Sequence, residues 1–583
     1  MALTELRPPA FADSRKQMTA AAAAVKVLES EGVDVVFGIP GASILPFYDA
    51  LRTSSIRHIV VRHEEGGTHA ADGYARATGK VGIAIATSGP GGTNFVTGLY
   101  TAWADSIPII TITGQVPASQ LHREGFQAVD ICEIVKPVVK KSFLVREAAQ
   151  LPWVFREAFR IAREGRPGPV HIDLPQDVQA ELINYDPELD EPLAVHKVVP
   201  SAGKIARAVE WLANADRPVL MPGGGVIIAE GAELVRQLAE HLDLAVSPTL
   251  MGKGAIDETH PLYMGIVGIQ TSQRFANALF LETDVVCAIG ARFASRHTGD
   301  LPTYRGDRTF VQVDIEATQI GRIFEPDLGI VGDAYLTLEA MLAEAKRRYP
   351  NGIKRAAWTA RIAEQKAALG RRTDFDNVPI KAPRVFGEIN KFYGPDTTFV
   401  TAIGLYQIFS GQFQITHNPR KYFVCGQAGP LGWEISACTG IKLAKPTEEV
   451  VGIVGDYSWE FLMEEVAVAV QYNIPFVMIM LNNAHLGLIR QAERGAFQFD
   501  ANYEIKIGYG KDGYGMNHVQ AMEAMGGLGV RVTEPGAIAA ALAWARSESE
   551  AKRLPVLVEI LTEPEENAAM GSSIASVAEF APT

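Results

Sequence analysis

The stretch that decides the fold runs from Val450 to Leu488 and reads VVGIVGDYSWEFLMEEVAVAVQYNIPFVMIMLNNAHLGL. It opens with an apolar run of strand length, Val450–Val454, that ends in the sharp turn Gly455-Asp456. A segment of helix length then leads to a second apolar run, Phe476–Leu481, which ends abruptly in Asn482-Asn483. This order of apolar strand, helix and apolar strand predicts a βαβ unit in a parallel sheet.

Two hard oxygen donors, Asp456 and Asn483, each follow one of these predicted strands. We therefore expect both at the carboxyl edge of the sheet, where open α/β sheets bind ligands. With a nearby backbone carbonyl, for which His485 is the candidate, they supply half of an octahedral shell that Mg²⁺ commonly completes with water and phosphate oxygens. The pattern indicates a diphosphate held through magnesium. The alternative is that Gly455-Asp456 is only a tight turn in which Asp caps a helix.

Composition favours a large enzyme of about three or four domains, at roughly 150 residues each, within the 583 residues. Apolar residues make up 47% and charged residues 21%, which predicts a large core and little disorder. The net charge of −13 argues against nucleic acid as the main partner. No apolar run reaches the length of a membrane span, and the polar segment 1–17 lacks the apolar centre of a secretion signal.

The chain contains four cysteines without metal-like spacing, mostly in apolar contexts, which predicts reduced thiols in a cytoplasmic protein. They are Cys132, Cys287, Cys425 and Cys438.

Three α/β blocks follow one another, and each predicts a doubly wound parallel sheet with helices on both faces. We place them at residues 18–184, 200–348 and 379–562, with a linker over 185–200 and a polar helix over 351–372. Further strands are expected at Val35–Gly38, His58–Val61, Gly82–Ala86, Ile109–Thr113 and Val170–Asp173, and at Val219–Met221, Val285–Ile289 and Thr309–Val313.

A series of short segments carries a resemblance to a known family. They are FGIPGA at 37–42, TSGPG at 87–91, GQVP at 114–117, GRPGP at 165–169, TLMG at 249–252, RHTG at 296–299, GQAGPLGW at 426–433 and NNAHLGLIRQ at 482–491. With these segments and the spacing of Asp456 and Asn483, the chain resembles thiamine-diphosphate enzymes of the acetohydroxyacid synthase branch, and most closely the glyoxylate carboligases. It departs from the family signature at Tyr457, where the third residue is usually Gly.

The resemblance implies an enzyme that decarboxylates one small 2-oxo acid and joins the product to a second, so that two glyoxylates give tartronate semialdehyde and carbon dioxide. It implies thiamine diphosphate, Mg²⁺ and FAD as cofactors, with a structural flavin because the reaction exchanges no net electrons. A synthase that makes acetolactate and a flavin-active pyruvate oxidase are the alternatives. A non-catalytic relative is disfavoured by the intact motif residues. The family also implies an obligatory homodimer, with a homotetramer as the expected assembly.

The resemblance gives Glu64, in the segment RHEEG at 62–66, the role of activating the cofactor through a hydrogen bond to its pyrimidine ring. A carboxyl group in an apolar pocket has a raised pKa and can stay protonated to donate that bond. The alternative is that Glu64 and Glu65 are solvated charges at a helix start. We interpret Glu64 as functional and Glu65 as structural. Glyoxylate carboligases usually have valine at this position, so Glu64 leaves the substrate range open.

Other residues take roles only through the resemblance. Leu431, near Gly429, matches the bulky residue that bends the cofactor into its V shape, with a core leucine as the alternative. Gln127 matches a residue on the substrate side, and Gln115 is expected beside the cleft. The residues expected to cradle the diphosphate are Ile403, Gly404, Leu405, Tyr406 and Gln407 with Gly455, Asp456, Tyr457 and Ser458.

Arg490 lies on the helix that lines the acceptor pocket in this branch, where a guanidinium would bind the acceptor carboxylate. The alternative is a surface arginine. Ala492 stands where synthases that exclude large groups place tryptophan.

The middle block is expected to hold the flavin. Its glycine turn, Gly223, Gly224 and Gly225, follows a predicted strand and allows a ligand to approach the backbone closely. Without the resemblance this block predicts only a nucleotide-binding-like Rossmann fold. The remaining residues that align with flavin-holding segments are Thr249, Leu250, Met251, Gly290, Arg292, Arg296, Asp314 and Ile315.

Overall fold

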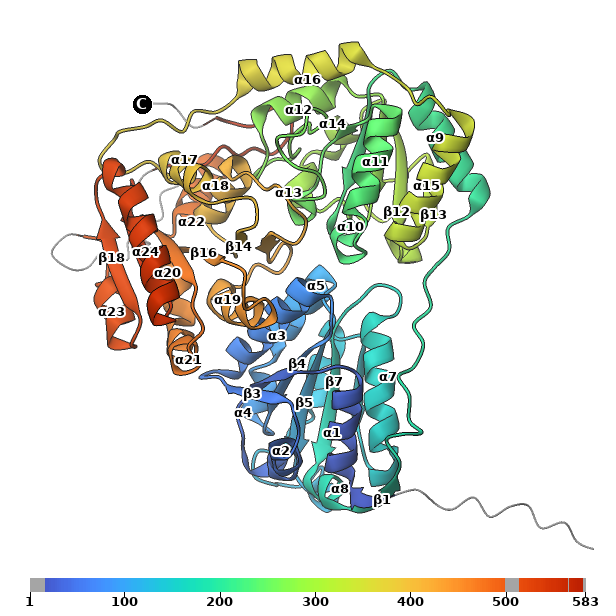
Figure 1. Ribbon diagram of the computed structural model, residues 1–583, viewed down its shortest axis with the longest axis vertical. Coiled ribbons are helices and arrows are strands. Elements are labelled where there is room, and N and C mark those ends of the chain that lie inside the picture. Colours follow the sequence, from blue (N-terminus) through green and yellow to red (C-terminus); the bar gives the residue numbers. More distant parts are fainter. Residues whose placement is uncertain (1–15, 499–512, 565, 580–583) are drawn as a thin grey trace, which may run out of the picture.

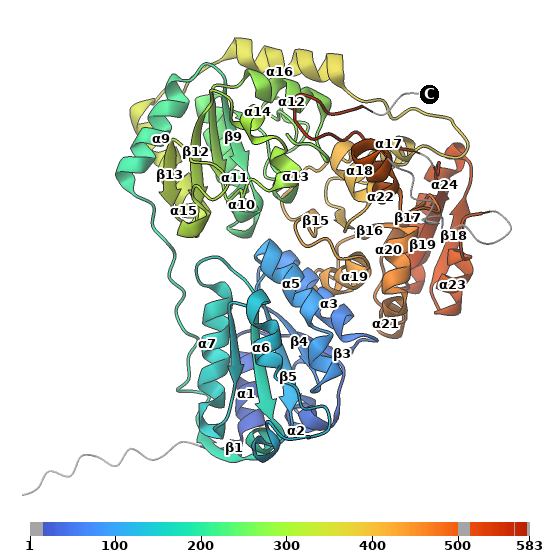
Figure 2. The same cartoon turned by 180° about the vertical axis from the view of Figure 1, so that it is seen from behind.

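The computed structural model describes residues 16–498, 513–564 and 566–579, and these form three α/β blocks (Figure 1). The N-terminal block lies below the other two in Figure 1, and the segment 186–201 runs along the outside to the central block, as Figure 2 also shows. Helix α16 (Ala356–Leu369) crosses the central block before the chain enters the C-terminal block. The predicted class of three doubly wound parallel sheets is confirmed, whereas the boundaries of the three blocks stay predictions.

The N-terminal block is built on a six-stranded parallel sheet with helices on both faces. Helices α1 (Ala20–Ser30) and α7 (Leu151–Arg163) share one core with the sheet. Helices α3 (Glu64–Thr78) and α5 (Val96–Asp105) share the other. The strand order is β3 (Arg57–Val60), β2 (Val35–Gly38), β4 (Gly82–Ala86), β5 (Ile109–Gln115), β7 (Val170–Pro175) and β6 (Lys141–Leu144).

The other two blocks repeat this architecture. The central sheet has the order β10 (Ala245–Val246), β9 (Pro218–Pro222), β11 (Val285–Ile289), β12 (Thr309–Asp314) and β13 (Leu328–Val331). The C-terminal sheet has the order β15 (Tyr422–Val424), β14 (Thr398–Thr401), β16 (Val450–Gly455), β17 (Val477–Asn482), β19 (Val556–Leu561) and β18 (Leu528–Val532). Every pair of neighbouring strands in these two sheets is parallel.

The strands that the sequence predicts agree with the structure to within two residues at each end. Edge strands such as β6 and β18 escaped prediction because their partly exposed sequences lack a continuous apolar run. A short antiparallel pair, β1 (Lys16–Thr19) and β8 (Leu182–Tyr185), was also not expected. In the described part of the chain, no helix combines the length and apolar character needed to cross a bilayer.

The N-terminal and C-terminal blocks meet where α3 packs against α19 (Trp433–Ala444). The two backbones are so close that a Cβ atom added at Gly440 would lie 1.9 Å from the carbonyl oxygen of Ala70. One added at Gly73 would lie 2.6 Å from the carbonyl oxygen of Ala437. Only glycine is compatible with this contact.

We predict that Gly440→Ala destabilises the protein by about 1–3 kcal/mol, the usual cost of overpacking, although alanine favours helices. Thermal unfolding followed by circular dichroism measures the change. The control is Gly203→Ala on the exposed face of α9 (Ala202–Asn214), where an added Cβ meets nothing within 4 Å. This control should gain about 0.4–1 kcal/mol. Equal effects of the two substitutions would contradict the proposed contact.

Candidate functional site

A cavity of about 340 Å³ opens at the carboxyl edge of the C-terminal sheet, where β14, β16 and β17 end. Most residues predicted to hold the diphosphate and the metal line it, because the chain turns into a loop or helix directly after each of these strands. They are Ile403, Gly404, Leu405, Tyr406, Gly429, Leu431, Gly455, Asp456, Tyr457, Ser458, Asn483 and His485.

The oxygens beside Asp456 suit a hard divalent cation. Burial raises the pKa of Asp456 to about 7, and its buried Oδ2 has no partner among the described residues. The Oδ1 of Asn483 accepts a hydrogen bond from the His485 backbone N at 3.3 Å, and the His485 carbonyl accepts one from Gly487 N at 2.7 Å. The described residues contain no cluster of three His, Cys, Asp or Glu side chains that could hold a metal. A cation here would therefore need the amide and carbonyl oxygens as well as the carboxylate.

A buried carboxyl group that the sequence analysis missed, Glu434, lies behind the cavity wall. Its Oε1 accepts hydrogen bonds from the hydroxyls of Tyr406 at 3.0 Å and Ser458 at 2.7 Å, while burial raises its pKa to about 7. Ser458 Oγ in turn accepts a bond from Gly432 N at 3.0 Å. Glu434 thus connects two predicted diphosphate segments with the loop that carries Leu431. The only signal in the sequence was a charged residue inside an apolar helix.

Two predicted residues point away from the cavity. Gln407 is buried, and its Oε1 accepts a hydrogen bond from Arg296 of the central block at 2.9 Å. Arg490 Nη1 donates to the carbonyl of Pro564 at 3.0 Å. Neither side chain lines the 340 Å³ cavity, so their roles toward cofactor and acceptor stay predictions.

The C-terminal segment contributes residues to the cavity that no motif marked. Glu563 and Glu566 both line it, because the chain folds back over the sheet edge after β19. Glu566 Oε2 accepts a hydrogen bond from Ala382 N at 2.7 Å, and burial raises its pKa to about 7. Sequence reasoning could not place these residues, since their neighbours in space are more than 180 residues away in the chain.

Glu64 lies in a separate group within the N-terminal block. Its Oε2 accepts a hydrogen bond from Asn94 Nδ2 at 2.9 Å. A Cβ added at Gly91 would lie 3.5 Å from its Oε1. Gln127, which has a φ of 60°, packs nearby against Gly89. The described residues that line the 340 Å³ cavity all fall between 382 and 566, so Glu64 of the same chain does not reach it.

A side chain of the C-terminal block, Glu465, holds the start of α3 in the same chain. Glu465 Oε1 accepts hydrogen bonds from the backbone N atoms of Arg62 and His63, each at 2.8 Å. Burial raises the pKa of Glu465 to about 7. Glu65, interpreted as structural, has Oε1 at 3.3 Å from His69 Nε2. Glu465 was not anticipated, because its partners are backbone groups of another block.

Gln115 is buried at the end of β5, where its Nε2 donates to the Val129 carbonyl at 2.8 Å and to Asp173 at 3.0 Å. Gln115 therefore holds the segment that follows Gln127 and does not line the 340 Å³ cavity.

A larger cavity of about 500 Å³ lies between the three blocks. Gly223 does not line it, and a Cβ added there would lie 2.2 Å from the Gly290 carbonyl oxygen. Four arginines of the wall were missed by the sequence analysis: Arg76, Arg163, Arg166 and Arg420. The predicted flavin residues that line the cavity are Gly224, Gly225, Thr249, Leu250, Met251, Gly290, Arg292, Arg296, Asp314 and Ile315. Glycines in this wall let a ligand approach the backbone closely, and several guanidinium groups can bind phosphate. The wall therefore suits a large anionic nucleotide.

Family models for thiamine pyrophosphate enzymes match all three blocks. The N-terminal TPP binding domain matches residues 18–134, the central domain 205–341 and the C-terminal TPP binding domain 402–560.

Curated relatives match along nearly the whole chain. A glyoxylate carboligase from Escherichia coli O157:H7 is 48% identical over 97% of this chain and 96% of its own. A probable acetolactate synthase large subunit from Methanocaldococcus jannaschii is 37% identical over 94% and 93%. An acetolactate synthase large subunit from Corynebacterium glutamicum is 36% identical over 94% and 87%.

We predict that Asp456→Asn weakens the joint binding of Mg²⁺ and thiamine diphosphate by at least about tenfold, because a charge-assisted contact contributes about 1.5–3 kcal/mol. The melting temperature of the metal-free protein should not fall, since the substitution removes a buried charge. Calorimetric titration and thermal unfolding measure the two effects. Asp173→Asn is the control, because Asp173 is also buried with its pKa raised to about 7 but does not line this cavity. Unchanged cofactor affinity in Asp456→Asn would refute the assignment.

Proposed function

Because the chain belongs to the thiamine pyrophosphate enzymes, we propose that it joins two glyoxylates. One glyoxylate loses its carboxylate as carbon dioxide, and its remaining carbon forms a bond to the aldehyde carbon of the other, which gives tartronate semialdehyde. The observation that carries this proposal is the 48% identity to a glyoxylate carboligase over 97% of the chain.

Thiamine diphosphate would occupy the 340 Å³ cavity, with Mg²⁺ held by Asp456, Asn483 and the His485 carbonyl. When bound, the thiazolium ring of the cofactor accepts the electron pair that decarboxylation releases. The residues Ile403–Tyr406 and Gly455–Ser458 would surround the diphosphate with backbone N–H groups. Leu431 would press on the cofactor from the opposite wall. The unpartnered Asp456 Oδ2 supports this placement of the metal.

FAD would occupy the 500 Å³ cavity as a structural ligand. The predicted glycine and arginine residues on its wall support this placement.

Glu64 would serve the cavity of a partner subunit. Among the described residues, no wall residue of this cavity comes from the N-terminal block, while Glu64, Gly91 and Gln127 gather in that block outside both cavities. Two chains related by a two-fold axis would complete both sites, which makes the homodimer obligatory. We further propose a homotetramer built as a dimer of dimers.

We place the enzyme in the cytoplasm. All four cysteines are unpaired, and three of them are buried, which fits a reducing compartment.

Acetolactate formation from pyruvate is the second candidate function. Glu64 stands where glyoxylate carboligases usually have valine, and acetolactate synthases match most of the chain at 36–37% identity. The two candidates share the cofactors and differ in the substrate.

We predict that glyoxylate is consumed in preference to pyruvate, with one carbon dioxide released for each tartronate semialdehyde formed. Competition between the two substrates, with products identified by mass spectrometry and carbon dioxide measured separately, tests this. Acetolactate as the main product from an equal mixture would contradict the proposal and favour the second candidate.

We predict that Glu64→Gln and Asp456→Asn are each nearly inactive alone but recover activity when mixed. Glu64→Gln removes the acidic proton, whose help is worth about two or more orders of magnitude. Random reassociation makes about half of the dimers mixed, and each mixed dimer has one intact site of its two. Activity should therefore return to about one quarter of the wild-type value. The mixture is unfolded and refolded together, and each variant treated alone is the control. No recovery from a mixture that contains mixed dimers would show that both residues act within one chain.

A further inference from the structure

One loop borders both cavities. It spans residues 425–432 between β15 and α19 and is called the shared loop below. Gly426 and Gln427 line the 500 Å³ cavity, whereas Gly429 and Leu431 line the 340 Å³ cavity. A ligand in either cavity therefore touches the same short stretch of backbone.

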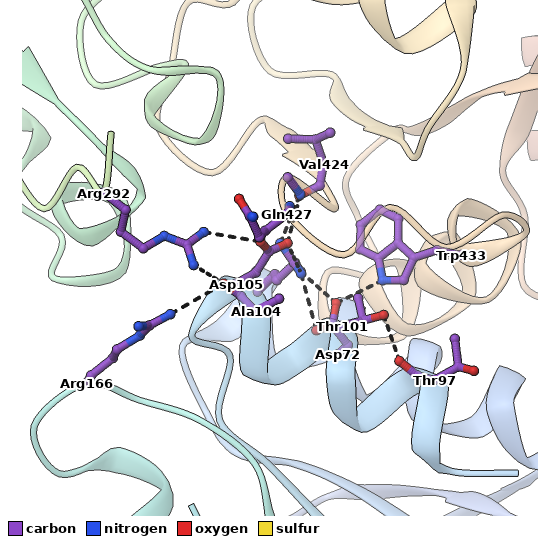
Figure 3. A network of polar contacts seen from close by, with 12 residues as sticks. Asp72, Thr97, Thr101, Ala104, Asp105, Arg166, Arg292, Val424, Gln427 and Trp433 are labelled. Carbon is purple, nitrogen blue, oxygen red and sulfur yellow. Dashed lines mark hydrogen bonds and ion pairs between the residues drawn. The ribbon is translucent and has the colours of Figure 1, made fainter. Parts of the chain in front are cut away.

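Asp105 holds the first half of the shared loop. This residue ends α5 of the N-terminal block, and its side chain is fully buried. Its Oδ2 accepts a hydrogen bond from Gly426 N at 2.8 Å, and its Oδ1 accepts one from Gln427 N at 3.1 Å (Figure 3). Two consecutive backbone N–H groups are thus fixed by one carboxylate from a different block.

Arg76 on α3 keeps this carboxylate in place. Its Nη2 donates to Asp105 Oδ2 at 3.0 Å, and its Nη1 donates to the carbonyl of Val424, the residue before the shared loop, at 2.9 Å. Burial alone would lower the pKa of Arg76, but Asp72 and Asp105 raise it above its ordinary value. Arg76 therefore stays charged, and its contacts are strong because water is excluded.

Arg292 of the central block reaches the same carboxylate from the side of the larger cavity. Its guanidinium lies 3.6 Å from Asp105 Oδ1 and donates to the carbonyl of Ala104, as Figure 3 shows. Arg166 donates to that carbonyl as well, at 3.4 Å. Arg292 and Arg166 both line the larger cavity, so a ligand there would meet the groups that surround Asp105.

We propose that Asp105 is a positioning residue that couples the occupancy of the two cavities through the shared loop. The inference rests on the proposed function in one respect, namely that flavin and thiamine diphosphate are the two ligands. A flavin that packs against Gly426 and Gln427 restricts the loop before Leu431 closes on the other cofactor. Less conformational entropy is then lost when thiamine diphosphate binds, so its affinity rises. By linkage, thiamine diphosphate strengthens flavin binding by the same factor.

The experiment measures affinity rather than turnover. Calorimetry with saturating Mg²⁺ gives the Kd for thiamine diphosphate of the full-length protein, once flavin-free and once loaded with FAD. In the wild type we expect the two values to differ by about 5- to 150-fold, the usual range of coupling between sites. In Asp105→Asn the ratio should fall close to one, because the neutral amide cannot accept both loop N–H groups while it faces two arginines.

Two controls separate this coupling from a general loss of stability. Glu258→Gln removes another buried carboxyl group, which pairs with Lys253 and lines neither cavity, and it should keep the coupling. Gln427→Pro removes the side chain, as Gln427→Ala does, and in addition the N–H that donates to Asp105 at this exposed position, so it should weaken the coupling. Gln427→Ala keeps that N–H and the coupling.

Each outcome decides the inference. The inference is supported if the wild type shows the coupling, Asp105→Asn and Gln427→Pro lose it, and the controls Glu258→Gln and Gln427→Ala keep it. Gln427→Pro and Gln427→Ala decide the matter if Asp105→Asn does not fold. A wild type that binds both cofactors independently, or binds thiamine diphosphate but no flavin, overturns the inference and leaves the proposed carboligation standing. A wild type that binds no thiamine diphosphate overturns the proposed function itself.

Discussion

The backbone contact between α3 and α19 determines where both halves of the proposed chemistry lie. Helix α3 begins at Glu64, and α19 begins directly after the loop that carries Leu431. The helices cannot slide past each other, because the positions of Gly73 and Gly440 leave no room for a side chain. A buried polar contact reinforces the arrangement, since Asp72 accepts hydrogen bonds from Arg76 on the same helix at 2.6 Å and from the Trp433 indole at 2.9 Å. Removing one partner of the buried ion pair between Asp72 and Arg76 would leave the other charge buried and uncompensated, which is costly.

Sequence reasoning placed residues correctly where their position depends on the end of a strand. Asp456 and Asn483 follow continuous apolar runs, and the parallel sheet brings the ends of such runs to one edge. It could not show the direction of a side chain that depends on another block. Gln407 directly follows Tyr406, yet the helix turns it toward Arg296 of the central block. Glu465 could not be found either, because its partners are backbone N–H groups some 400 residues earlier and no local pattern encodes them.

Burial raises the pKa of Glu434, Asp456 and Glu465 to about 7 in each case, but the three carboxyl groups differ in what surrounds them. One oxygen of Glu434 accepts two hydroxyl hydrogen bonds, and one oxygen of Glu465 accepts two backbone N–H bonds. These two groups hold segments of chain in place. Asp456 instead lines the 340 Å³ cavity, and its Oδ2, like the Oε2 of Glu434, has no partner among the described residues. An ionised carboxylate in that position is costly without a cation, so its environment favours metal binding over a structural role.

A flavin in the larger cavity would have a physical role even in a reaction that transfers no net electrons. All three blocks contribute to its wall, with Arg166 from the first, Arg292 from the second and Arg420 from the third. A ligand that contacts all three blocks binds only when they are assembled, and it stabilises that assembly in proportion to its own affinity. The same wall includes the start of the shared loop, whose far end reaches the diphosphate cavity. A flavin held there would therefore influence catalysis through the position of Leu431 and without any redox step of its own.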